Sequence, residues 1–227
     1  MIVDSPTKST EEILLILCKA VQKVLKKASD QEILFSPFVQ TINKTCLKPD
    51  IGCFTIFEGG LSGLLIMNFS KEAALDIYRS YMSHMGIPED ELSILHTSDD
   101  VANVLGELMN QTMGHFQTDL RHELHVTVKQ NQPKMLVVSK DISIAAQIED
   151  PQYRRVSFET EQHKPFFLEL ALEKTEFELL FPYEKEKDED VDEIFLKAKQ
   201  EQQKKDSADK KTGTGEADDE FIKKMGL

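Results

Sequence analysis

The chain has 227 residues, of which 40% are hydrophobic, enough for a single core of about 180 residues followed by a polar segment. Its 40 acidic and 27 basic residues give a formal net charge of −13, which argues against nucleic acid or an anionic membrane surface as a partner because both would repel the chain. Cys18, Cys46 and Cys53 stand among apolar residues without CxxC spacing, so we expect buried thiols in a reducing compartment.

The amino-terminal region predicts a helix and no targeting signal. The sequence MIVDSPTKSTEE has neither the cationic region nor the apolar segment of a secretion signal. No stretch of the chain reaches the roughly 18 apolar residues of a membrane span. We therefore expect a cytoplasmic protein without membrane insertion. Ser9 and Glu12 have the spacing of a capping box, and the apolar residues that follow recur with a helical period to about Ala28.

A β-hairpin and a second helix are predicted next. Residues 54–57 and 64–69 are rich in apolar side chains and flank a turn at 58–60, which contains two glycines. Ser70 is a suitable N-cap for a helix that ends at Gly86.

The segment from Asp99 to Leu124 predicts a long amphipathic helix, with Thr97 or Ser98 as its N-cap. Its apolar residues recur at steps of three, four and eight, namely Val101, Leu105, Leu108, Phe116 and Leu120. At about 100° per residue, four other residues share a narrow sector roughly opposite. We call them the polar stripe: Asn103, Glu107, Asn110 and Gly114.

The polar stripe has two explanations. Glycine costs a helix interior about 1 kcal/mol relative to alanine, so Gly114 suggests that a partner approaches the helix backbone closely at this point. The alternative is an ordinary solvated face, which every amphipathic helix must have. Periodicity alone does not separate the two, and the wider spacing of the residues is needed.

Five more strands are predicted after this helix, because apolar residues cluster or alternate in short segments: 126–128, 135–138, 142–148, 156–158 and 166–172. Helices followed by a run of strands indicate an α+β fold in two layers, with a mostly antiparallel sheet packed on long helices. We assign residues 1–183 to this domain.

The composition changes abruptly after Tyr183. Residues 184–227 contain fourteen acidic and ten basic residues, which cannot bury a core, so we predict a charged, disordered tail. Apolar residues return in the last nine positions, 219–227, where Phe221, Ile222 and Met225 would share one helical face behind two acids.

The spacing around the polar stripe resembles a known family signature. Three residues separate Asn103 from Glu107, two separate Glu107 from Asn110, and twenty-two separate Asn110 from Pro133. This resembles the CheC/CheX family of chemotaxis phosphatases, marked by Asp or Ser, x3, Glu, x2, Asn, x22, Pro. Three positions match, and Asn103 departs from the pattern. The resemblance spans residues 11–174, and the single Glu-x-x-Asn helix is typical of the CheX branch, whose members pair through their sheets; this implies a homodimer.

The resemblance implies a phosphatase that acts on a phosphorylated CheY-like response regulator. Hydrolysis of an aspartyl phosphate is an in-line attack by water, and positioning supplies most of the catalysis. By resemblance, Asn110 orients the water and Glu107 docks to the regulator's active-site lysine. We expect Asn103, Gly114 and Pro133 to contact the partner. The required Mg²⁺ would belong to the regulator, so no cofactor of the chain's own is expected.

The end of the tail resembles the C-terminal regulator-binding peptide of the unrelated phosphatase CheZ, with an arbitrary amphipathic end as the alternative. In the first case the tail would raise the local concentration of the regulator at the polar stripe.

Two other functions stay open at the level of sequence. One is a non-catalytic module of the same fold that binds a receiver domain or a flagellar switch component. The other is a structural dimer whose site is degenerate because Asn103 replaces Asp or Ser. A metal site is not expected, because its candidate ligands match no standard spacing: His115, Asp119, His122 and His125.

Overall fold

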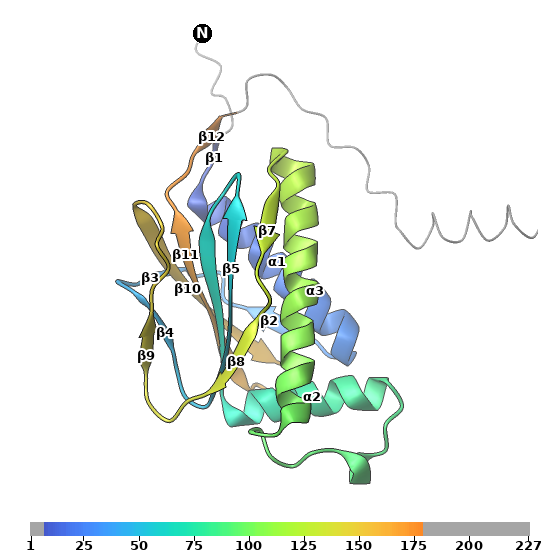
Figure 1. Ribbon diagram of the computed structural model, residues 1–227. Helices are drawn as coiled ribbons and strands as arrows, with labels where there is room; N and C mark the ends of the chain where they lie inside the picture. Colours follow the sequence, from blue (N-terminus) through green and yellow to red (C-terminus); the bar gives the residue numbers. More distant parts are fainter. Residues whose placement is uncertain (1–6, 179–227) are drawn as a thin grey trace, which may run out of the picture. The chain divides into compact units, whose positions relative to one another are not determined.

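The computed structural model describes residues 7–178, and in this part of the chain three α-helices pack against one side of a curled antiparallel sheet (Figure 1). The helices are α1 (Thr10–Ser29), α2 (Lys71–His84) and α3 (Asp99–Leu124), with a short 3₁₀ turn at Glu89–Glu91. The predicted α+β fold is therefore confirmed. None of the described helices is long and apolar enough to cross a membrane.

The main sheet has eight strands in the order β2-β10-β11-β6-β5-β7, with β3 also paired to β10 and β8 also paired to β5. Strands β4 and β9 form one two-stranded sheet, and β1 and β12 form another. The strand bounds are β1 Thr7–Lys8, β2 Ile33–Phe35, β3 Gln40–Thr41, β4 Thr45–Leu47, β5 Ile51–Gly59, β6 Gly63–Phe69, β7 Val128–Gln130, β8 Lys134–Val137, β9 Ile142–Ile144, β10 Pro151–Thr160, β11 Pro165–Glu173 and β12 Phe177–Glu178. Because β7 and β8 share one edge of β5, both lie beside α3 (Figure 1).

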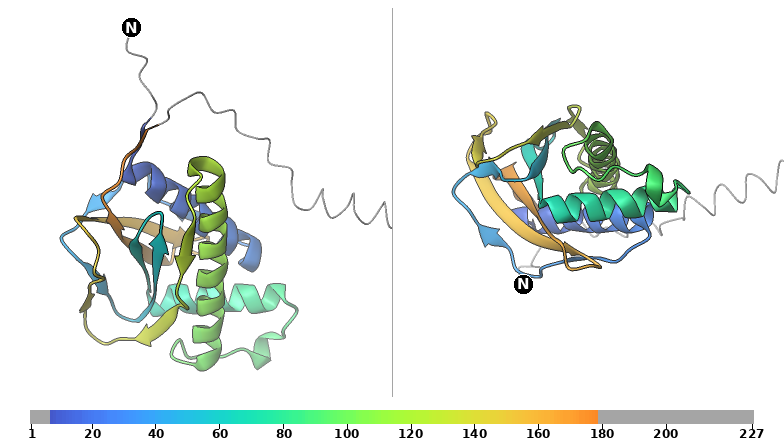
Figure 2. Two further views of the ribbon diagram at one scale, coloured as in Figure 1. Left: turned by 45° about the horizontal axis from the view of Figure 1, so that its top comes forward. Right: turned by 90° about the horizontal axis from the view of Figure 1, so that it is seen from below.

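The helices begin where their capping residues predict. The backbone N–H of Ser9 donates to Glu12 Oε2 at 2.9 Å, which confirms the capping box of α1. The side chain of Ser70 accepts from the backbone N–H of Ala73 at the start of α2. Figure 2 shows α1 and α2 side by side in the helix layer, and α3 packs against both of them.

The hairpin forms, but its turn lies later than predicted. Glu58 and Gly59 extend β5, and the turn consists of residues 60–62. The reason is a third strand: Glu58 pairs with Lys129 and Gly59 with Val128 of β7. Gly59 has φ +142°, and a Cβ there would lie 2.6 Å from the carbonyl oxygen of Thr127. This close backbone pairing requires glycine and keeps the segment in the sheet.

The strands after α3 form with changed limits. The strand predicted at 126–128 begins only at Val128, because the chain is still closing the end of α3 at Val126, whose N–H donates to Leu120 O at 3.4 Å. The strand predicted at 142–148 ends at Ile144, and the one predicted at 156–158 extends over Pro151–Thr160. The short strands β2, β3 and β4 were not predicted from the sequence.

The core lies between the helices and the main sheet. Aromatic rings connect the two layers: Phe57 of β5 meets Phe116 of α3 edge-on with centroids 5.7 Å apart. Phe166 stacks on Phe69 at 5.2 Å. The three cysteines are buried and free, as predicted. Burial raises the pKa of the Cys18 and Cys53 thiols to about 12, so neither is a reactive thiolate near neutral pH.

Candidate functional site

The polar stripe faces away from the core, as its spacing predicts. Ser98, the better of the two predicted caps, accepts from the N–H of Val101 at 3.3 Å and starts α3. The five predicted apolar positions of the helix are all buried. Within the polar stripe, Asn103, Glu107 and Gly114 are exposed and Asn110 is half-buried. The helix therefore presents the stripe outward on a rigid, well-anchored element.

Glu107 carries the only charge of the polar stripe. Its Oε1 accepts a hydrogen bond from Gln111 Nε2, one turn along α3, at 3.0 Å. Glu107 forms no ion pair with any residue between 7 and 178. Its carboxylate is thus exposed, held at one oxygen, and able to accept from a cation that arrives from outside.

Asn110 contacts a residue that the sequence did not single out. Gln130, the last residue of β7, donates from Nε2 to Asn110 Oδ1 at 3.3 Å. Gln130 is half-buried and follows the buried Val128 by two positions, so both face α3 while Lys129 faces solvent. The sequence signals that could have placed Gln130 near the site are the period-2 pattern of β7 and its closeness in sequence to Pro133, but neither identifies Asn110 as its partner.

Pro133 lies near the polar stripe. It is half-buried in the link between β7 and β8. On one side of it, Gln130 bonds to Asn110; on the other, Met135 lies beside Gly106, where an added Cβ would be 3.8 Å from Met135 Cγ. The link that contains Pro133 therefore runs alongside α3 at the level of Asn110 and Gly106.

No close packing contact within the described residues explains why position 114 is a glycine. Apart from its two chain neighbours and the adjoining backbone of α3 itself, no atom of the described residues lies within 4 Å of the position that its Cβ would take. Its carbonyl oxygen accepts from Thr118 Oγ1 at 2.9 Å. A mid-helix glycine with open space around it lowers helix stability by about 1 kcal/mol without an internal gain. The prediction that a partner approaches here stays open.

The histidines near the end of α3 do not change this reading of the site. Burial and the nearby Lys23 hold the pKa of His115 below its ordinary value. His122 and His125 are exposed. Within residues 7–178, no group of three or more His, Cys, Asp or Glu side chains is arranged to hold a metal ion.

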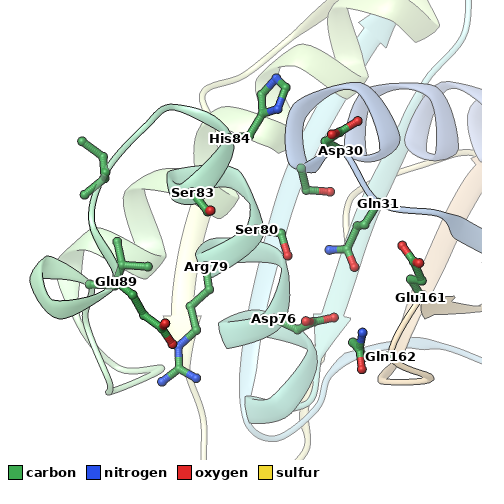
Figure 3. Close-up of a pocket in the computed structure, with 13 residues that line it drawn as sticks. Asp30, Gln31, Asp76, Arg79, Ser80, Ser83, His84, Glu89, Glu161 and Gln162 are labelled. Carbon is green, nitrogen blue, oxygen red and sulfur yellow. The ribbon is translucent and has the colours of Figure 1, made fainter.

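The structure also contains a polar cavity of about 730 Å³ at another place. It lies between the C-terminal end of α1, α2 and the β10–β11 turn, and Figure 3 shows Asp76 and Ser80 of α2 on the side toward Gln31, Glu161 and Gln162, with Arg79 and Glu89 on the other side of that helix. Asp30, Asp76, Glu89 and Glu161 contribute carboxylates. Asp76 accepts a hydrogen bond from the hydroxyl of the buried Thr160. No residue of the polar stripe lines this cavity.

Solved structures similar to this fold include chemotaxis proteins of the CheX and CheC-like type. CheX from Desulfovibrio desulfuricans has a TM-score of 0.59 and 19% identity over 71% of this chain and 99% of that chain. CheX from Vibrio vulnificus has a TM-score of 0.59 and 17% identity over 71% of this chain and 99% of that chain. CheX from Borrelia burgdorferi, solved in complex with CheY, BeF3 and Mg²⁺, has a TM-score of 0.55 and 16% identity over 71% of this chain and 98% of that chain.

The described domain therefore has the CheX/CheC-like fold, and the predicted resemblance is confirmed at the level of structure. The chain belongs to the family described as Protein of unknown function (DUF3334), whose model matches residues 4–227. No curated protein matches the sequence.

At 16–19% identity the solved structures establish a shared fold, so the role of each side chain is argued from this chain alone. The predicted homodimer stays a prediction, as does the domain limit at residue 183. The predicted contacts of Phe221, Ile222 and Met225 lie outside the described residues.

Proposed function

We propose that this protein is a phosphatase that removes the phosphoryl group from the aspartate of a CheY-like response regulator. The observation that carries the proposal is the outer side of α3, where Glu107 and Asn110 stand three positions apart and turn away from the core. The CheX-like fold supports it, and one protein of that fold, CheX from Borrelia burgdorferi, forms a complex with CheY.

Glu107 is the docking residue in this proposal. Its exposed carboxylate forms no ion pair with any cation among residues 7–178, and one of its oxygens accepts a hydrogen bond from Gln111. A lysine ammonium in the regulator's phosphorylation site is a complementary partner. A charge-assisted hydrogen bond of this kind fixes the register of two surfaces as well as adding affinity.

Asn110 is the catalytic residue, because its carboxamide reaches the phosphoryl site when Glu107 is docked. The water oxygen attacks phosphorus in line with the bond to the aspartyl oxygen. That bond breaks, the aspartate carboxylate leaves with the electron pair, and the water proton goes to the released phosphate. A neutral carboxamide can hold the water without placing a second negative charge beside the phosphoryl oxygens. The Mg²⁺ that neutralises these oxygens would be the regulator's own.

The remaining predicted contacts surround this pair. Asn103 and Gly114 extend the surface along α3, and Pro133 borders it on the side of the β7–β8 link. The residues 219–227 would act as a second, tethered contact that raises the local concentration of the regulator.

The residue at position 103 favours a second candidate function, in which the protein binds a receiver domain without catalysis. Asn103 replaces the Asp or Ser of the family signature, and its side chain makes no hydrogen bond to the other side chains or backbone of residues 7–178. A non-catalytic module that binds a receiver domain through the same side of α3 would tolerate this change.

The test is the rate at which phosphorylated, Mg²⁺-loaded CheY-like receivers from the same organism lose their phosphoryl group. Wild type, Asn110→Ala and Asn43→Ala are compared at equal folded concentration; Asn43 is an exposed asparagine between β3 and β4. We expect acceleration by wild type and by Asn43→Ala, and a loss of about 10²-fold or more in Asn110→Ala, because a positioning group has been removed.

Two outcomes oppose the proposal. If no receiver is accelerated but one binds in a phosphorylation-dependent manner, the binding module is the correct function. If Asn110→Ala and Asn43→Ala are equally active, the catalytic role of Asn110 is wrong.

A further inference from the structure

The hydrogen bond between β7 and α3 is donated by Gln130, a side chain whose amide oxygen has no partner of its own among the described residues. Gln130 Nε2 donates to Asn110 Oδ1 at 3.3 Å, whereas Gln130 Oε1 is buried and has no hydrogen-bond partner among the described residues. A buried acceptor without a partner costs stability, and an apolar side chain of similar size would avoid that cost. The contact is therefore not explained by a contribution to folding.

The backbone of Gln130 is fixed by the sheet. It pairs with Phe57 of β5, and Phe57 is fully buried against Phe116 of α3. The strand that carries Gln130 and the helix that carries Asn110 are thus both packed on the same β5 residue. Because both backbones are held, the side-chain hydrogen bond acts on the Asn110 carboxamide and not on the position of the helix.

The chemistry of the carboxamide makes this contact directional. Asn110 has an acceptor oxygen and a donor nitrogen that differ little in size, and only its hydrogen-bond partners decide which of them faces outward. A donor at Oδ1 fixes the rotation of the group and leaves the second lone pair of that oxygen for another donor, such as a water molecule.

We propose that Gln130 is a positioning residue that fixes the orientation of the Asn110 carboxamide toward the regulator's phosphoryl group. This inference rests on the proposed phosphatase function. It predicts that Gln130 contributes to the rate of the chemical step and not to stability or to binding of the receiver.

Two variants and one control separate these effects. Gln130→Leu removes the donor and the unpartnered oxygen together. Gln130→Glu keeps the shape but offers only acceptors, which would turn the nitrogen of Asn110 toward β7 and its oxygen away. Gln40→Leu is the matched control, because Gln40 is an exposed glutamine in the distant strand β3.

The measurements are kcat with saturating phosphorylated receiver, affinity for the receiver activated with beryllofluoride, and the urea midpoint. We expect both Gln130 variants to lose about tenfold or more in kcat, as removal of an orienting group typically does. Receiver affinity should stay within about twofold and the urea midpoint of Gln130→Leu should not fall. Gln40→Leu should match wild type in all three.

A measurement without turnover tests the orientation itself. The side-chain amide signals of Asn110 in ¹H–¹⁵N spectra, assigned with Asn110→Ala, should show a lower order parameter in Gln130→Leu than in wild type. Unchanged kcat together with unchanged order of Asn110 would overturn the inference even if wild type is an active phosphatase. A loss confined to affinity or to stability would also overturn it. If wild type itself shows no turnover, the proposed phosphatase function is wrong.

Discussion

Two polar regions of the described domain differ in how they meet solvent. The cavity between α1, α2 and the β10–β11 turn is concave and is lined by carboxylates from four parts of the chain. The polar stripe stands on the outside of a single helix and has one carboxylate, Glu107. Enzymes that act on small molecules enclose them in concave sites. When the substrate is the phosphorylated site of another protein, the concave part of the combined site can belong to that protein, and the enzyme can contribute an exposed helix.

The largest difference between the two regions is expected in receiver affinity when a glutamate of each is replaced by lysine. Glu107→Lys should weaken receiver affinity by about tenfold or more, because an attractive charge-assisted contact becomes a repulsive one. Glu161→Lys, at an exposed glutamate of the cavity, should change affinity by no more than about twofold. Titration of each variant with beryllofluoride-activated receiver measures both. Equal losses would mean that the net charge of the protein, and not the polar stripe, attracts the regulator.

The second prediction concerns the free energy of unfolding of the protein when a cavity residue is changed. Asp76→Ala should lower the free energy of unfolding by about 1–2 kcal/mol, because it leaves the buried Thr160 hydroxyl without its acceptor. Dephosphorylation by the folded variant should not change. Urea denaturation measures the loss, and Thr160→Val in the same background should cause little further loss, since the two groups form one interaction. Reduced turnover in folded Asp76→Ala would show that the cavity takes part in function.

The smallest effect distinguishes two glycines of α3. Gly114→Ala and Gly106→Ala should each raise stability by up to about 1 kcal/mol, because alanine favours the helix and neither Cβ meets a close neighbour. Gly106 is covered by Met135, whereas Gly114 faces open space. Only Gly114→Ala should therefore weaken receiver binding. Thermal unfolding and a binding titration of the two variants provide the test. Identical affinities would contradict the prediction that the partner approaches the helix backbone closely at Gly114.

Local sequence signals located the helices with good accuracy. Ser9, Ser70 and Ser98 each stand at an N-cap, and α3 spans the predicted residues Asp99–Leu124. A cap and the first turn of a helix interact within four residues, so the relevant information lies in a short window. The same window is too short for β2, β3 and β4, which have two or three residues each and depend on pairing with β10 and β9.

The candidate site was only partly visible in the sequence. Periodicity placed the polar stripe on the exposed side of α3, and the spacing to Pro133 pointed to the region beside it. The contact of Gln130 with Asn110 was not predictable, because it depends on how β7 pairs with β5 and how both pack on α3. Sequence patterns indicate the face of an element, whereas the neighbour across that face is set by tertiary packing.

All residues assigned to the site within the described domain lie on one uninterrupted segment, from Asn103 to Pro133. Insertions elsewhere, for example among the short strands between Ile33 and Leu47, leave the spacing within that segment unchanged. An exchange of this one segment between related genes would transfer the residues proposed for docking, catalysis and positioning together. In evolution the site can therefore be inherited as a unit while the rest of the sheet diverges.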